Sequence, residues 1–492
     1  MKKLLTTVLV SLCLSSTISA NAAEKTPISW PDYLAMGTVT DFTDTVTTSF
    51  SGSDKLDFLF AYALYDNAGT VSSSAPSSSD MGPTNAIISQ AQAISSQTQP
   101  VVVVYDLNLS VGLNIDGTGN KQYDPKDYDW DNQNQMQWGF ENVILNGQAL
   151  AKAKPTSANK YGAIILNPDF LGQIHTDNEE DYQFKNVNIN KAVLDALTAE
   201  GIVAKDVPNF SNDVKGFIEA NNYILSTYFT SVNYGWVVNT WAGGNANFVH
   251  GNSTDVLTNV DTVNGILDET KAYSSSYKPD FIVFDKYEAN DYSALTSVSS
   301  AQSASNVINL GYLFNARDMH NYLSYIGGVS SHVSSPAVLW QIPGGHLVQS
   351  SGDKAQPVTI GTEPDYIFGS GLSEYTPSTF VTNPAQVIPF LSSLNLNTSM
   401  PIAYKYNGSI GNYLTMDQTG SVGKYDWTQP NTSELVDNNV VAVLWGGGST
   451  TGMVDNIARD RTDSTQTKSL SDGGWLMNTV QNYYANPQKL AS

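Results

Sequence analysis

The chain has 492 residues and is strongly acidic, with 46 Asp and Glu against 24 Lys and Arg and a formal net charge of −22. It has no basic stretch, so we expect neither nucleic acids nor anionic membrane surfaces as partners. Only 14% of the residues are charged, whereas Asn, Ser, Thr, Gly and Tyr are abundant. This composition suits a neutral, hydroxyl-rich ligand better than an ionic one.

The first residues have the pattern of a secretory signal peptide. Lys2 and Lys3 form a basic segment, residues 4–16 are apolar, and Ala20-Asn21-Ala22 offers a cleavage site. The apolar segment is too short to span a bilayer. We therefore expect residues 1–22 to be removed and the protein to be secreted or periplasmic.

The mature chain, residues 23–492, is expected to be held together by its core alone. Its single cysteine, Cys13, lies in the segment that is removed, so no disulfide can form. Roughly 470 residues are enough to bury a large core. We find no repeat, no linker and no membrane anchor in the mature chain, and we expect a single catalytic domain that acts as a monomer.

Eight short apolar runs, typical of buried strands, alternate with stretches of helical pattern. The runs are 57–65, 101–105, 161–166, 234–239, 280–284, 337–340, 365–369 and 440–445. The helical stretches include 86–94, 141–152, 190–197, 217–229 and 313–326. Strands that alternate with helices pair in parallel. The pattern predicts an α/β fold, a (β/α)8 TIM-type barrel with enlarged loops at its C-terminal face. The alternative is an open doubly wound sheet, which lacks a G-x-G-x-x-G after the first run.

In such a barrel the carboxyl ends of all strands face one mouth, where active sites lie. Carboxylates follow several of the runs, and aromatic and polar residues accompany them. The predicted substrate-binding residues are Trp236, Asn239, Trp241, Trp340, Gln341, His346 and Trp445. Indole faces stack on sugar rings, while amides bind hydroxyl groups, so we expect a carbohydrate substrate. The alternative is that the tryptophans belong to the core.

Hydrolysis of a glycosidic bond needs an acid and a second carboxylate that acts as base or nucleophile. Asp169 is the predicted acid, because it follows a proline and an apolar run, where burial would raise its pKa. Asp106 would tune the acid or position water, and Asp285 or Glu288 would be the base or nucleophile. A helix cap is the structural alternative for Asp169 and Asp106, and a salt bridge with Lys286 for the other two.

Two of these strand ends resemble motifs of the family 6 glycoside hydrolases, which are inverting cellulases on a modified barrel. The segments are VVVVYDL at 101–107 and IILNPDFL at 164–171. The resemblance implies that Asp169 is the general acid and that Asp106 supports it. The chain departs from the family at Asn167, where the family has glutamate, and it lacks the Arg-Asp-Cys that follows the first motif.

No cofactor and no metal are predicted, because the five histidines show no zinc-ligand spacing. The acidic loop 116–131 could hold calcium or could simply be solvated. The sequence therefore predicts a secreted glycoside hydrolase that cleaves a β-linked, glucan-like or related polysaccharide with paired carboxylates. A non-catalytic carbohydrate-binding protein on a degenerate barrel is the alternative, and Asn167 in place of glutamate is the feature that favours it.

Overall fold

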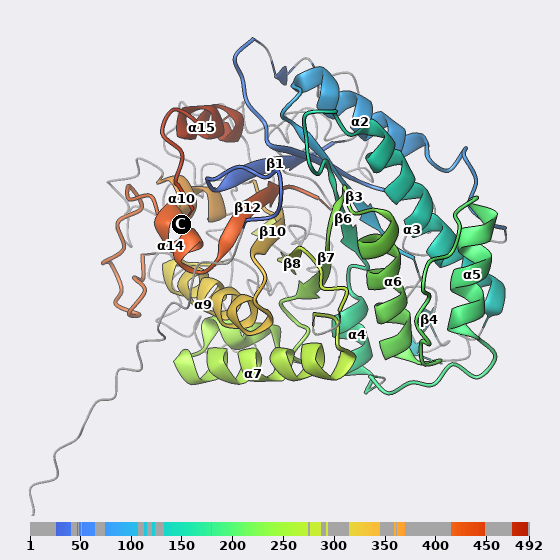
Figure 1. The fold of residues 1–492 in the computed structure, drawn as a ribbon. Coiled ribbons are helices and arrows are strands. Elements are labelled where there is room, and N and C mark those ends of the chain that lie inside the picture. The colour runs from blue at the N-terminus through green and yellow to red at the C-terminus, as the bar shows by residue number, and fades with distance from the viewer. Residues whose placement is uncertain are drawn as a thin grey trace, which may run out of the picture.

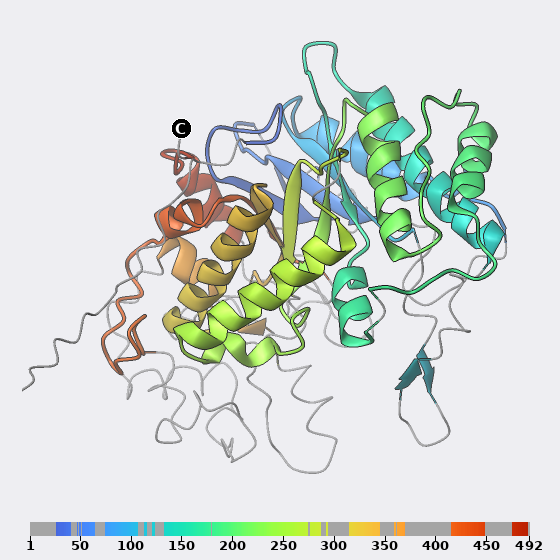
Figure 2. The ribbon, with the colours of Figure 1, turned by 60° about the horizontal axis from the view of Figure 1, so that its bottom comes forward.

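The computed structural model of the chain describes residues 26–40, 47, 49–50, 52–63, 74–106, 113–115, 121–123, 132–178, 180–273, 276–286, 292–293, 314–344, 359–360, 362–369, 415–447 and 475–490. Within these residues, parallel strands form a closed eight-stranded barrel with helices around it (Figures 1 and 2). The predicted (β/α)8 barrel is confirmed. The predicted signal peptide, Glu288, His346 and the acidic loop except 121–123 lie outside the described residues, so those predictions stay predictions.

The barrel strands follow the chain but are interrupted by small accessory strands. They are β1 (Ala35–Val39), β2 (Phe58–Tyr62), β3 (Gln99–Val104), β6 (Ala163–Leu166), β7 (Asn233–Asn239), β8 (Phe281–Asp285), β10 (Ala337–Ile342) and β12 (Val440–Trp445). Around the barrel the order is β1, β12, β10, β8, β7, β6, β3 and β2, and every neighbouring pair is parallel. All eight carboxyl ends therefore lie at one mouth.

Two short antiparallel pairs accompany the barrel, and helices surround it. The pairs are β4 (Leu113–Ile115) with β5 (Lys121–Tyr123), and β9 (Tyr292–Ser293) with β11 (Thr359–Ile360). The helices are α2 (Gly82–Ile94), α3 (Gln133–Ala153), α4 (Phe170–Thr176), α5 (Ile189–Ala199), α6 (Val214–Tyr228), η3 (Ala246–His250), α7 (Ser253–Thr270), α9 (Ala316–Val333), α10 (Glu363–Phe368), α14 (Thr432–Asp437) and α15 (Trp475–Tyr483). Figure 1 shows α3 and α6 along one side of the barrel and α7 and α9 along another.

Seven of the eight predicted runs are barrel strands, and the run at 365–369 is wrong. Those residues belong to α10, which has a proline in its first turn and Glu363 and Asp365 beside the helix N-terminus. Both features favour a helix. The missing strand is β1, which the sequence analysis overlooked because its segment AMGTV contains the weak strand formers Ala and Gly.

Gly37 lies where β1 fits between its two neighbours. It pairs with Leu444 of β12 on one side and with Phe58 of β2 on the other. A Cβ at this position would lie 2.4 Å from Leu444 Cδ2 and 2.7 Å from Phe58 Cβ. Such contacts are too short for any side chain, so glycine is what lets the two neighbouring strands pack against β1 at this level.

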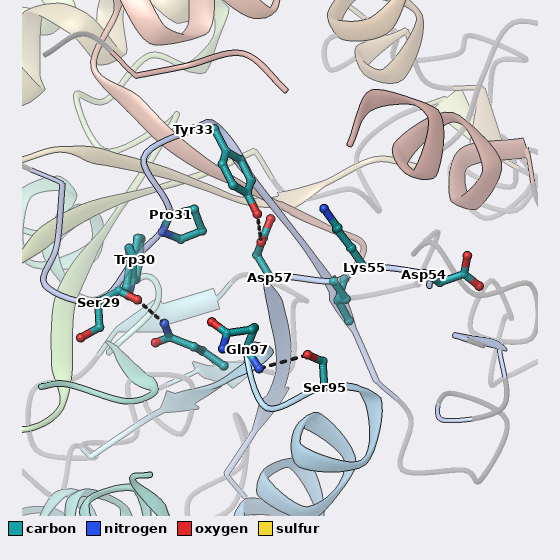
Figure 3. Close-up of a pocket in the computed structure, with 11 residues that line it drawn as sticks. Ser29, Trp30, Pro31, Tyr33, Asp54, Lys55, Asp57, Ser95 and Gln97 are labelled. Atoms are coloured by element: carbon teal, nitrogen blue, oxygen red, sulfur yellow. Dashed lines mark hydrogen bonds between the residues drawn. The ribbon is translucent and has the colours of Figure 1, made fainter. Parts of the chain in front are cut away.

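The amino ends of the strands are sealed by aromatic and acidic side chains. The Trp30 ring packs against Phe58 at 4.5 Å and Phe281 at 5.1 Å between ring centroids. The buried Asp57 carboxylate accepts hydrogen bonds from the Tyr33 and Tyr484 hydroxyls, at 2.7 and 2.6 Å. Figure 3 shows the cavity beside them, about 380 Å³ in volume. It lies at the end of the barrel opposite to the carboxyl ends of the strands.

We predict that Gly37→Ala destabilises the protein by about 1–3 kcal/mol, the usual cost of overpacking. Gly265→Ala is the matched control, because Gly265 lies in α7 and a Cβ there meets nothing within 4 Å. The control should be neutral or more stable, since alanine favours a helix over glycine by up to about 1 kcal/mol. Urea unfolding midpoints measure both, and equal midpoints for wild type and Gly37→Ala would contradict the close fit.

Candidate functional site

The end of β6 has an unusual backbone that is held by β3. Asn167 and Asp169 both have positive φ angles, 43° and 73°. Left-handed backbone at a residue other than glycine is strained and persists only where its surroundings fix it. Here the Asn167 backbone N–H donates to the Val104 carbonyl at 2.8 Å, and the Asn167 side-chain oxygen accepts from the Asp106 N–H at 2.9 Å. The two strand ends that carry the motifs are thereby joined.

Asp106 is fixed on its other side by helix α3. Gly139 of α3 passes so close that a Cβ there would lie 2.2 Å from the Asp106 carbonyl oxygen. One turn further, the Asn142 side-chain amide donates to the Tyr105 carbonyl at 3.2 Å. The Asp106 residue is buried. Its main chain is therefore held by contacts from both β6 and α3, which positions its carboxylate beside the end of β6.

Asp169 occupies the N-cap position of α4, as the helix-cap alternative expected, but its side chain makes no capping hydrogen bond. Its Oδ1 accepts a hydrogen bond at 2.8 Å from Nδ2 of Asn239, the last residue of β7. The left-handed backbone thus directs the carboxylate toward β7. Burial raises the pKa of Asp169 above its usual value, while the Asn239 hydrogen bond acts in the opposite direction.

Asn239 holds a second carboxylate at the same time. Its Nδ2 also donates to Oδ2 of Asp285 at 2.9 Å. Asp285 is the last residue of β8 and pairs with Asn239 in the strand register. Because β7 lies between β6 and β8, one amide group at its end joins the carboxylates on both sides. We call Asp169, Asn239 and Asp285 the bridged pair.

Three polar atoms at this mouth are buried and have no hydrogen-bond partner among the described residues: Asn239 Oδ1, Asn167 Nδ2 and Trp340 Nε1. Buried polar groups in native proteins are almost always paired, and an exception calls for an explanation. One acceptor and two donors at the strand ends are a suitable set for the hydroxyl groups of a ligand.

Trp340 and Gln341 both face the barrel interior because β10 carries a bulge. The register with β12 is interrupted between Leu339 and Ile342, and Gln341 has a φ of 54°. The Trp340 ring lies 6.0 Å from the Tyr62 ring, and the Gln341 amide donates to the Tyr62 hydroxyl. A bulge re-aims side chains in this way beside functional sites. Both residues are thus kept at the mouth.

Three other predicted binding residues do not join them. Trp236 lies on the outer face of β7, where its Nε1 donates to Asn222 of α6 at 2.9 Å. The fully buried Trp445 ring packs 5.9 Å from Phe368 of α10. Trp241 packs against α4, whose Gly172 leaves room for its ring. These contacts correct the expectation that Trp236, Trp241 and Trp445 gather with the carboxylates, and they match the core alternative.

Lys286, the predicted salt-bridge partner of the acidic pair, binds a residue that the sequence analysis missed. Its ammonium group lies 2.8 Å from Glu363 of α10, and both side chains are buried. Glu363 was overlooked because its segment was taken for the start of a strand. Burial, followed by the charges of Asp285 and Glu363, raises the pKa of Tyr322 far above its usual range. This hydroxyl therefore lies near both carboxylates.

No protein-family model matches the chain, and no curated protein matches it significantly. Several solved structures share its fold. GH26C from a Muricauda species covers 92% of this chain and 86% of its own, at 9% identity and a TM-score of 0.33. The catalytic core of a xylanase A covers 84% and 87%, at 7% and 0.32. The catalytic domain of Cel6B from Cellulomonas fimi covers 87% and 98%, at 11% and 0.31. These neighbours are glycoside hydrolases, and at such values the likeness concerns the fold alone.

Two searches of the described residues complete the picture. No group of three or more His, Cys, Asp or Glu side chains in these stretches is arranged to hold a metal ion. Within the same stretches, no helix is both long and apolar enough to cross a membrane.

We predict that Asp169→Asn makes the protein more stable than wild type at neutral pH. Burial raises the pKa of Asp169, so the folded wild type favours the protonated acid and loses stability as the pH rises through that pKa. Asparagine does not ionise, so the advantage of the variant should grow from pH 3 to pH 7. Urea unfolding at several pH values measures it.

Asp426→Asn is the control with the opposite sign. Hydrogen bonds from the Thr428 hydroxyl and N–H lower the pKa of Asp426. Its charged form therefore stabilises the fold, and the variant should lose stability relative to wild type as the pH rises. Parallel pH profiles for the two variants would contradict the assignment of a desolvated carboxyl to Asp169.

Proposed function

We propose that the chain is a glycoside hydrolase whose active site is the bridged pair at the mouth of the barrel. One observation carries the proposal: Asn239 donates to Asp169 and to Asp285, at 2.8 and 2.9 Å. Two carboxylates across one site are the minimum that acid-assisted cleavage of a glycosidic bond requires.

Asp169 is the proposed general acid. Burial raises the pKa of its carboxyl group, so it keeps a proton to a higher pH than an exposed aspartate. Its strained backbone is fixed by β3, and its side chain leaves the helix N-terminus uncapped. Strain of this kind, in a residue that serves no local structural purpose, is a common property of catalytic positions.

The proposed substrate is a neutral polysaccharide or oligosaccharide, a β-linked glucan or a related polymer. Asn239 Oδ1, Asn167 Nδ2 and Trp340 Nε1 supply one acceptor and two donors that a sugar hydroxyl can satisfy. The rings of Trp340 and Tyr62 supply aromatic surface beside them. Because the groups that lack partners are uncharged, the site suits a ligand whose polarity comes from hydroxyl groups.

Asp106 is the proposed supporting carboxylate, since Asn167 joins its main chain to the end that carries Asp169. Gln341 is proposed to contact the substrate from β10. Glu288 and His346 keep the roles that the sequence predicts for them, as a further carboxylate and a binding residue. Secretion, a single catalytic domain and a monomeric state belong to the same proposal.

The test is the turnover of Asp169→Asn on a panel of cellulose, β-1,3-glucan, mannan and xylan. General acid catalysis contributes about 10²–10⁴-fold, so release of reducing ends should fall by that factor while substrate binding survives. On an aryl glycoside with a very good leaving group the loss should be much smaller, because that group departs without a proton. Asp426→Asn, on the surface, should leave both rates unchanged.

A sugar-binding protein without catalysis would give a different result. The wild type would then bind one of the polysaccharides, by affinity electrophoresis or calorimetry, and release no reducing ends from any of them. Wild-type rates in Asp169→Asn on the polysaccharide would equally remove this residue from the mechanism.

A further inference from the structure

The separation of the bridged pair points to the stereochemical course of the reaction. We infer that the enzyme retains the anomeric configuration of its substrate, with Asp285 as nucleophile, Asp169 as acid and base, and Asn239 as the residue that positions both. The inference rests on the proposed function. It differs from what the resemblance to the family 6 enzymes implies, since those enzymes are inverting.

The distance between the carboxylates follows from their shared donor. Both bonds start at Asn239 Nδ2, with lengths of 2.8 and 2.9 Å. An amide nitrogen carries two hydrogens about 120° apart, which places Asp169 Oδ1 and Asp285 Oδ2 about 5 Å from each other. Retaining enzymes have carboxyl groups about 5–5.5 Å apart, whereas inverting enzymes need about 6.5–9.5 Å to admit a water molecule. The observed spacing fits the first class.

The two carboxylates differ in a way that assigns their roles. Asp285 is the last residue of β8 and pairs with Asn239 on one side and with Trp340 on the other. The next residue, Lys286, is anchored by the buried ion pair with Glu363. Asp285 is therefore held from both sides, as a nucleophile must be. Asp169 follows the strained turn after β6, and burial raises its pKa, which suits the group that carries the proton.

The reaction then has two steps. In the first, an oxygen of Asp285 bonds to the anomeric carbon while the bond from that carbon to the leaving oxygen breaks, and the proton of Asp169 passes to the leaving oxygen. In the second, a water oxygen bonds to the anomeric carbon, its proton passes to Asp169, and the ester bond breaks with its electron pair returning to Asp285. Each step inverts the carbon, so the product keeps the original configuration.

The role of Asn239 follows from the same contacts. Because each amide hydrogen serves one carboxylate, the side chain fixes the pair at a spacing that suits attack by Asp285. Its Oδ1, which has no partner among the described residues, remains available to a sugar hydroxyl. Asn239 is thus a positioning residue for both carboxylates.

The first experiment is proton NMR of the wild-type reaction on the polysaccharide that the panel identifies, recorded before the product anomers equilibrate. A product with the anomeric configuration of the substrate supports the inference. The opposite anomer overturns it but leaves the proposed function standing. Absence of cleavage on every polysaccharide overturns the proposed function, on which the inference depends.

The second experiment assigns the two carboxylates by azide rescue, with the activated aryl glycoside as substrate. Asp285→Ala leaves a space into which azide fits, so the glycosyl azide should have the configuration opposite to that of the substrate. Asp169→Ala should give a glycosyl azide with the configuration of the substrate, because azide then replaces water in the second step. The reverse pattern of products would overturn the assignment of roles, as would wild-type turnover in Asp285→Ala.

A third experiment separates positioning from structural support. Asn239→Ala should lower turnover by about 10²-fold, a usual effect of misplaced reacting groups. Because the Asn239 hydrogen bond lowers the pKa of Asp169, its loss should also move the alkaline limb of the pH–rate profile to higher pH. Asn222→Ala, which frees Trp236 on the outer face, should cost stability without moving that limb. An unchanged limb in Asn239→Ala would overturn its positioning role.

Discussion

The parallel pairing of β1 with β12 closes the barrel, and the arrangement of the site depends on that closure. A closed parallel sheet has no edge, and it places the ends of β6, β7 and β8 side by side at a fixed spacing. The single amide of Asn239 can reach two carboxylates only because its strand lies between theirs. Gly37 takes part in this closure from across the barrel, because a side chain there would push β1 away from its neighbours.

The mouth of the barrel contains most of the unfavourable local features that the described residues show. Asn167, Asp169 and Gln341 have left-handed backbone, and a desolvated carboxyl lies beside buried polar atoms that have no partner. Each feature costs free energy, of order 1–3 kcal/mol for a strained residue. The strands below it are almost entirely buried and apolar, and their packing offsets that cost. A stable scaffold that carries a destabilised end is the usual arrangement of an enzyme.

The sequence predicted the barrel and most of its strands because runs such as VVVV and AIIL have few other uses. The same property hid the direction of individual side chains. A parallel strand buried on both faces has no alternation of polar and apolar residues, so nothing in the sequence distinguishes the outward Trp236 and Trp445 from the inward Trp340. Asp169 and Asp285 were found from their positions after apolar runs. The bridge through Asn239 was not, because it depends on which strands are neighbours and on a left-handed turn at a residue other than glycine.

The contacts of Asp57 bear on the order in which the chain can fold. Its carboxylate binds the Tyr484 hydroxyl across a sequence separation of 427 residues. Nearby, the Leu34 N–H donates to the carbonyl of Gln488. The first strand of the barrel therefore finds both its last neighbour and its covering helix only among residues made near the end of synthesis. Closing so long a loop is slow, and until it closes β1 has an unpaired edge. The chain thus cannot complete its barrel from the amino end onward, and because residues 34 and 488 lie side by side, a covalent link there with new ends elsewhere would let the same barrel close earlier.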